Sequence, residues 1–154
     1  NREDDVRIDE ALAETDMQGM KHRRLGTLSG GERQRAWLAM AIAQEPEILL
    51  LDEPTTYLDI KHQLDLMHLV YRLHKQRGIT VIMVLHDLNH AARFSNRLVA
   101  VKKGGIFADG VVDDVFTEEN LRALYEVETS IMTVSKNGKD MLVCFPYDVS
   151  QPGL

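Results

Sequence analysis

Three groups of residues in this sequence have the side chains and the spacing that phosphate chemistry requires. The first is the stretch SGGE at residues 29–32, at the start of a predicted helix. Its glycines leave the backbone N–H groups of the helix N-terminus uncovered, and such groups bind anions. Arg33 and Arg35 add positive charge nearby. Because Ser29 and Glu32 also fit the S-x-x-E capping box, the stretch is compatible with both a helix cap and an anion site.

The second group is a pair of acids that follows an apolar run. The run ILLL at residues 48–51 predicts a strand, and Asp52 and Glu53 come directly after it. Ligands of parallel sheets bind at the carboxyl ends of the strands. Asp52 could hold Mg²⁺ there, directly or through water, and Glu53 could act as a general base on a water molecule. The alternative is that two acids merely end a strand.

The third group is His86, which follows the next predicted strand. Because neighbouring parallel strands end at the same edge of a sheet, we expect His86 near Asp52 and Glu53. A lone histidine can instead be a structural residue. His90 stands four residues later and could share a zinc ion with His86, but no third ligand stands at helical spacing.

The elements that position these groups follow from apolar periodicity and from capping residues. The sequence predicts helices over about residues 7–15, 31–43, 60–76 and 88–94, and a fifth helix that Thr117 caps. Asp59 is the predicted N-cap of the third helix, and Gly78 is its predicted C-terminal stop. The predicted apolar stripe of that helix consists of Ile60, Leu64, Met67 and Tyr71.

The predicted strands fall into a parallel pair and two hairpins. The runs at about residues 48–51 and 79–85 predict two buried strands, and the helix between them makes a right-handed crossover in a parallel sheet. Two hairpins follow, one about Gly104-Gly105 and one with Asn137-Gly138 at its turn.

The composition excludes some classes of protein. The chain has 154 residues, a formal net charge of −6 and one cysteine, Cys144, so an intrachain disulfide is impossible. The acidic balance disfavours a dedicated nucleic-acid binder, and the basic run at residues 21–24 is predicted to be a solvated face. The apolar runs are too short to span a bilayer.

The order and spacing of these groups resemble the ATP-binding-cassette ATPases. The matching strings are LSGGERQ (signature motif, residues 28–34), ILLLDE (Walker B, 48–53), TYLD (D-loop, 56–59) and VLHD (switch histidine, 84–87). The resemblance implies an α/β fold that is part of a P-loop NTPase domain of the ABC-ATPase type. That fold combines a partial parallel sheet, flanking helices and C-terminal hairpins.

The resemblance also implies a role for each group. In this family two nucleotide-binding domains sandwich two ATP molecules, and the signature motif of one contacts the γ-phosphate held by the other. Carried over, the residues that bind the partner's ATP are Ser29, Gly30, Gly31, Glu32 and Gln34, with Asp59 across the dimer interface. The catalytic and metal-binding residues are Glu53 as general base, His86 on the γ-phosphate and Asp52 on Mg²⁺ through water.

One family motif is missing from this sequence. No G-x-x-x-x-G-K-[ST] string occurs, and the closest, at residues 137–140, lacks both the first glycine and the hydroxyl. The chain therefore resembles the C-terminal part of a nucleotide-binding domain. Residues 1–45 would be the end of the helical subdomain with the signature helix, and residues 46–154 the remainder of the RecA-like core with the hairpins. We expect exposed strand edges and self-association.

The strings around TTY at residues 55–57 and HDLNHAARFS at residues 86–95 resemble the importers of iron–siderophore complexes, with haem and vitamin B12 importers close by. This implies membrane permease partners, an indirect link to a substrate-binding protein, and a peripheral position on the cytoplasmic face of the bacterial inner membrane. A soluble cassette ATPase acting on DNA or ribosomes is one alternative. An interaction module without catalysis is another.

The chain of 154 residues, purified alone, is expected to show no Mg²⁺-dependent ATPase activity above that of its Glu53→Gln variant, because it has no phosphate loop to hold ATP. Release of inorganic phosphate measures this. Turnover that Glu53→Gln abolishes would contradict the expectation.

Overall fold

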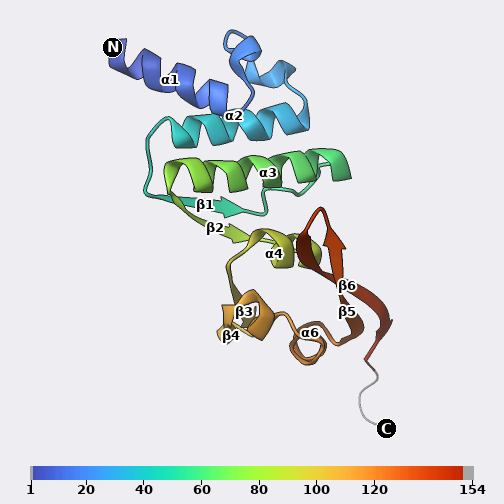
Figure 1. The fold of residues 1–154 in the computed structure, drawn as a ribbon. Coiled ribbons are helices and arrows are strands. Elements are labelled where there is room, and N and C mark those ends of the chain that lie inside the picture. Colours follow the sequence, from blue (N-terminus) through green and yellow to red (C-terminus); the bar gives the residue numbers. More distant parts are fainter. Residues whose placement is uncertain (1, 151–154) are drawn as a thin grey trace. The chain divides into compact units, whose positions relative to one another are not determined.

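The computed structural model describes residues 2–150, which divide into two compact units. The first unit ends at Leu85 and the second begins at His86. Figure 1 shows the succession of helices and strands along the chain. No helix within residues 2–150 combines the length and the apolar character that a membrane span needs.

The first unit contains three helices and a pair of parallel strands. Its elements are α1 (Arg2–Glu14), α2 (Gly30–Ile42), β1 (Ile48–Asp52), α3 (Ile60–Arg77) and β2 (Thr80–Val84), with two short 3₁₀ turns, Gln18–Met20 and Leu25–Thr27, before α2. The predicted α/β class is confirmed, as are the predicted elements. Only α1 differs clearly, since it begins at Arg2 rather than near residue 7, and acidic side chains in its first turn favour that earlier start.

Both ends of α3 follow the predicted capping residues. The Asp59 carboxylate accepts a hydrogen bond from the backbone N–H of His62 at 2.9 Å. At the other end Gly78 adopts a left-handed conformation, with φ of 69°, and its N–H bonds the carbonyl of His74. A residue without a Cβ enters this conformation at no steric cost, so the glycine ends the helix.

The parallel pairing of β1 and β2 is confirmed, and its register joins Ile48 to Thr80 and Asp52 to Val84. Only one face of this pair is covered. Leu49 is buried, whereas Leu50 on the opposite face is 71% exposed and Ile82 beside it is 54% exposed. The prediction that both strands are buried was therefore wrong for one of their two faces. An apolar run cannot reveal which of its faces is covered, because that depends on the neighbouring elements.

The core of the first unit forms where α3 packs between α2 and the strands (Figure 1). The predicted stripe on α3 was wrong at its two ends, since Ile60 is 77% exposed and Tyr71 is 42% exposed, whereas Met67 is buried as predicted. The buried stripe has the spacing i, i+3, i+4, i+7 and begins later in the helix. Its members are Leu66, Leu69, Val70 and Leu73, with Met67 beside them.

The second unit contains short helices and two antiparallel hairpins. Its elements are α4 (Leu88–Phe94), β3 (Arg97–Lys102), β4 (Gly105–Val111), α5 (Val112–Val115), α6 (Glu118–Tyr125), β5 (Val127–Lys136) and β6 (Lys139–Val149). Thr117 caps α6 as predicted, because its hydroxyl accepts a hydrogen bond from the N–H of Asn120 at 3.2 Å. The side chain of Asn89 ties α4 to β6 through two hydrogen bonds with the backbone of Cys144.

Both predicted hairpins are confirmed, and one turn is shifted by a residue. The second hairpin turns at Asn137-Gly138, where both residues have positive φ, as a two-residue turn requires. The first turns at Lys103-Gly104, with φ of 49° and 78°, and Gly105 is already the first residue of β4. Of two adjacent glycines the sequence cannot tell which one the turn uses.

The exposed face of β1 and β2 predicts self-association of the chain. We expect the double variant Leu50→Lys, Ile82→Lys to remain monomeric at about 10–100 µM, where the wild-type chain associates through apolar contact. Light scattering over a concentration series measures this. Ile60→Lys, which replaces an equally exposed apolar residue on α3, should associate like the wild type. A monomeric wild-type chain over that range would contradict the expectation.

Candidate phosphate-binding and catalytic site

The N-terminus of α2 carries a complete capping box, as predicted. The backbone N–H of Ser29 donates to the Glu32 carboxylate at 2.7 Å, and the N–H of Glu32 donates to the Ser29 hydroxyl at 3.3 Å. The bonds from Ser29, first from its backbone and then from its side chain, lower the pKa of Glu32, and the nearby Arg23 adds to this. Glu32 is therefore held as a carboxylate that organises the start of the helix.

The capping box leaves donors for an anion. The N–H groups of Gly30 and Gly31 lie in the first turn, where no helix carbonyl precedes them, and neither finds a backbone acceptor within residues 2–150. These groups fit a phosphate, because they are donors grouped at the positive end of a helix.

The two arginines predicted to add charge here behave differently. Arg35 is engaged elsewhere, because its guanidinium pairs with Asp16 at 3.2 Å and with Asp65 at 3.8 Å. It therefore links α2 to the turn that follows α1 and to α3. Arg33 is exposed on α2 and remains the arginine that could meet an anion.

Gly31 lies directly against a side chain of α3. A Cβ added to Gly31 would stand 2.9 Å from Cδ2 of His62, closer than real Cβ contacts come, whereas a Cβ on Gly30 would be 3.8 Å from Leu58. Gly31 is therefore the glycine whose missing side chain permits close packing. Gly30 has room for a methyl group.

The acids after β1 sit at the end of the strand, as predicted. Asp52 is the last residue of β1 and is exposed. Glu53 has a left-handed backbone with φ of 47°, while its N–H still bonds the carbonyl of Val84 at 3.1 Å. Its carboxylate accepts a hydrogen bond from the Thr56 hydroxyl at 3.2 Å. The chain turns sharply here and presents two adjacent carboxylates at the carboxyl end of the sheet.

The turn between Glu53 and α3 is held by its own backbone and by one side chain of α3. The N–H of Thr56 bonds the carbonyl of Glu53 at 3.1 Å, and the N–H of Leu58 bonds that of Thr55 at 3.2 Å. The amide of Gln63 donates to the carbonyl of Leu58 at 2.9 Å and to that of Thr55 at 3.4 Å. The first turn of α3 thereby fixes the loop that leads to Asp59.

Comparisons with known proteins give the family of this chain. Residues 1–56 match the ABC transporter family model. The chain is 48% identical over 149 residues to the iron(3+)-hydroxamate import ATP-binding protein of Bacillus subtilis (strain 168), covering 97% of this chain and 55% of that protein. It is 49% identical over 136 residues to the petrobactin import ATP-binding protein of Bacillus anthracis, covering 88% of this chain and 50% of that protein. The chain belongs to the ABC transporter family.

Solved structures of ABC proteins have the same fold. An ABC transporter in an inward-facing conformation superimposes with a TM-score of 0.86 at 27% identity, over 92% of this chain and 56% of that chain. A dimeric ATP-binding cassette bound to ADP and Pi gives a TM-score of 0.60 at 34% identity, over 70% of this chain and 46% of that chain. The chain spans about half the length of the curated ABC relatives that it matches.

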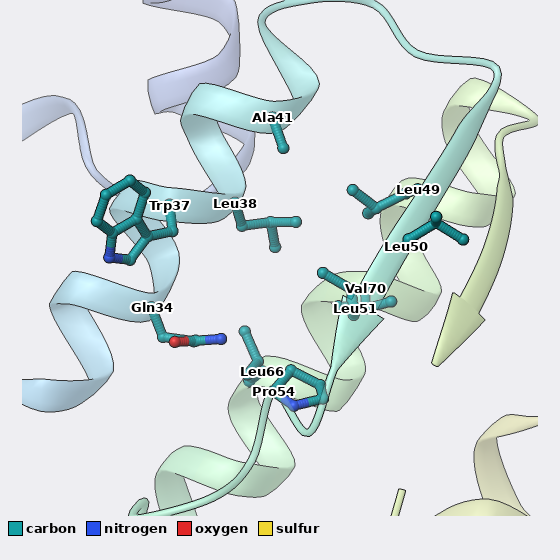
Figure 2. Close-up of a pocket in the computed structure, with 10 residues that line it drawn as sticks. All are labelled: Gln34, Trp37, Leu38, Ala41, Leu49, Leu50, Leu51, Pro54, Leu66 and Val70. Carbon is teal, nitrogen blue, oxygen red and sulfur yellow. The ribbon is translucent and has the colours of Figure 1, made fainter. Parts of the chain in front are cut away.

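The structure brings together several of the residues that the ABC motifs predict. Ser29 and Gly31 lie at the α2 N-terminus, which packs through His62 against the start of α3, where Asp59 is the cap. Asp52 and Glu53 share the end of β1. Gln34 lines an apolar cavity of about 210 Å³ between α2, β1 and α3 (Figure 2). Its contact with nucleotide stays a prediction.

The two histidines considered for catalysis or for zinc lie in the second unit. His86 begins that unit, two residues after the end of β2, and its placement near Glu53 stays a prediction. His90 is buried in α4, where its backbone N–H donates to the Asp87 cap and its ring meets Phe94 edge-on at 6.0 Å. No group of three His, Cys, Asp or Glu side chains within residues 2–150 is arranged to hold a metal ion, so the zinc alternative gains no support.

Sequence reasoning missed His62 and Gln63, which contact the candidate site residues and the loop that leads to Asp59. Both stand in the first turn of α3, where polar residues are common and carry no motif. Their partners, Gly31 and the carbonyls of Thr55 and Leu58, are visible only after folding. Only their position directly after the predicted Asp59 cap could have drawn attention to them.

The lowered pKa of Glu32 predicts a specific pH dependence of stability. A carboxylate with a depressed pKa stabilises the fold above the ordinary glutamate value of about 4.3 and loses that contribution as the pH falls through its folded pKa. The difference in stability between wild type and Glu32→Gln should therefore be largest near neutral pH and shrink in acid. Urea unfolding from pH 7 to about pH 3 measures this.

Glu119→Gln is the matched control, since Glu119 is an exposed glutamate in the first turn of α6 outside any capping box. Its difference from wild type should change less with pH. A constant difference for Glu32→Gln across that range would contradict the role of the Glu32 carboxylate.

Proposed function

We propose that this chain is part of the ATP-binding subunit of an ABC importer, which couples ATP hydrolysis to the uptake of iron–siderophore complexes. The observation that carries the proposal is the α2 N-terminus, where a capping box leaves the N–H groups of Gly30 and Gly31 without a backbone acceptor within residues 2–150. A helix end of this kind can receive phosphate oxygens.

The phosphate in question belongs to ATP held by a second copy of the domain. In the ABC arrangement the signature motif of one domain contacts the γ-phosphate that the phosphate loop of the other holds, so the two halves of a complete site would come from different copies. Ser29, Gly30 and Gly31 would contact the γ-phosphate, and Asp59 would lie across the dimer interface. The dimeric cassette bound to ADP and Pi supports this arrangement.

The hydrolytic groups would lie at the end of β1. Asp52 is an exposed carboxylate, which suits Mg²⁺ bound through water, and the ion would neutralise charge on the phosphates. Glu53 would take the proton of the attacking water, and His86 would contact the γ-phosphate. The hydrogen bond from Thr56 and the fixed turn hold the Glu53 carboxylate in place for that step.

The partners and the location follow from an importer's architecture. The subunit would bind integral membrane permeases at the cytoplasmic face of the bacterial inner membrane, as a peripheral protein, and would meet a substrate-binding protein only indirectly. Nucleic acid would not be a partner, since the net charge is −6.

The cargo is proposed from the relatives. The two compared above are named for import of iron(3+)-hydroxamate and petrobactin, which supports an iron–siderophore cargo. Their names do not favour the alternative of a soluble ATPase that acts on DNA or ribosomes.

The full gene product containing this chain is expected to hydrolyse Mg²⁺-ATP, and Glu53→Gln should lower kcat by about 100-fold or more, since general-base catalysis contributes that much. Glu47→Gln is the matched control, because Glu47 is an exposed glutamate just before the opposite end of β1 and should leave kcat unchanged. A full-length protein without ATPase activity, or one insensitive to Glu53→Gln, would overturn the catalytic assignment.

Uptake in cells tests the cargo. A strain that lacks the gene should lose accumulation of an iron(3+)-hydroxamate complex, the wild-type gene should restore it, and Glu53→Gln should not. Retained siderophore uptake together with lost haem uptake would overturn the proposed cargo but not the ATPase.

A further inference from the structure

We propose that His62 is a positioning residue that joins the phosphate-facing N-terminus of α2 to Asp59 at the start of α3. This inference rests on the proposed function, because it concerns the geometry of the same phosphate site. It assigns a role to a residue that none of the four motifs contains.

The first contact is between His62 and Gly31. The imidazole lies so close to the Gly31 backbone that a Cβ there would be 2.9 Å from Cδ2 and 3.3 Å from Cγ. A ring packed this tightly on a Cα fixes how far the α2 N-terminus stands from α3. The Gly31 N–H, which would face the phosphate in the proposed site, belongs to the same residue that the ring contacts.

The second contact is between His62 and Asp59. Nδ1 of the ring lies 2.8 Å from Oδ1 of Asp59, and the same oxygen accepts the backbone N–H of His62 at 2.9 Å. The Asp59 carboxylate is therefore held by the side chain and the backbone of one residue. The imidazole ring therefore connects the N-cap of α3 with the first turn of α2.

Charge supports the same arrangement. The hydrogen bonds from His62, first from its backbone and then from its ring, lower the pKa of Asp59. The positive charge of the imidazole, when it is protonated, also contributes to the lowered pKa of Glu32 in the capping box and of Asp65 one turn along α3, although each has a nearer partner that contributes more. His62 thus contacts the Asp59 carboxylate directly and influences carboxylates of both helices through charge.

A purely structural role does not explain this residue well. The side chain of His62 remains 45% exposed, so its removal opens no sealed cavity and costs little apolar burial. What its removal does change is the distance between two groups that, in the proposed dimer, must meet the partner simultaneously. Such misplacement affects rate more than folding.

Kinetics of the full gene product test the inference. His62→Ala should lower kcat by about tenfold, as expected for loss of one charge-assisted hydrogen bond and one packing contact. ATP affinity of the separate protein, measured by fluorescence titration, should stay unchanged, because the signature helix serves the partner's ATP. His62→Asn, which keeps a donor for Asp59, should recover part of kcat.

His68→Ala is the matched control, since His68 is an exposed histidine six residues along α3 and should leave kcat unchanged. If the wild type hydrolyses ATP but His62→Ala retains full kcat, the inference fails while the proposed function stands. A wild type without ATPase activity would overturn the proposed function instead.

Thermal unfolding of the same protein tests the contact without any ATPase measurement. Gly31→Ala should lower the unfolding temperature, because its methyl group meets the His62 ring, while Gly30→Ala should be neutral or stabilising. Adding His62→Ala should reverse the sign of the Gly31→Ala effect. If Gly31→Ala destabilises the protein equally with and without His62, the ring does not set the position of α2, and the inference is overturned.

Discussion

The first unit depends on the burial of one side of α3. Leu66, Leu69, Val70 and Leu73 form an apolar stripe at helical spacing, and both α2 and the strand pair pack against it. This burial supplies the main driving force for assembling the unit, because apolar area removed from water is the dominant favourable term in folding. It also fixes the positions in space of the C-terminal end of β1 and the N-terminal end of α2, where the proposed site lies.

The caps at the N-termini of α2 and α3 are made by residues close in sequence. They use some of the free N–H groups for stability and leave others for a ligand. Ser29 and Glu32 close the start of α2, and Asp59 closes the start of α3. Each cap uses side chains for some of the unpaired N–H groups and leaves others free. At α2 the free groups are those of the two glycines, so the same residues that stabilise the helix end also shape an anion site.

Two side chains of α3 connect this core to the site. His62 reaches the α2 N-terminus, and Gln63 holds the carbonyls of the loop that follows Glu53. One turn of helix therefore contacts both the proposed phosphate-facing helix end and the loop that follows Glu53. Because the turn is anchored by the buried stripe that follows it, the positions of the site and of the core are not independent.

The sequence by itself determined the features that depend on near neighbours. The capping box, the Asp59 cap, the Gly78 stop and the turn at Asn137-Gly138 involve residues a few positions apart, and local sterics and hydrogen bonding decide them. The order of the motifs in the sequence alone likewise carries the ABC resemblance.

Tertiary structure decided everything that joins distant segments. Which face of α3 is buried, that Arg35 pairs with Asp16 and Asp65 rather than with an anion, and that His62 meets Gly31 all depend on how α2, α3 and the strands pack. A periodic pattern fixes the spacing of an apolar stripe, but when a helix is covered from two sides it does not fix at which residue the stripe begins. That starting residue decides which side chains of α3 reach the site.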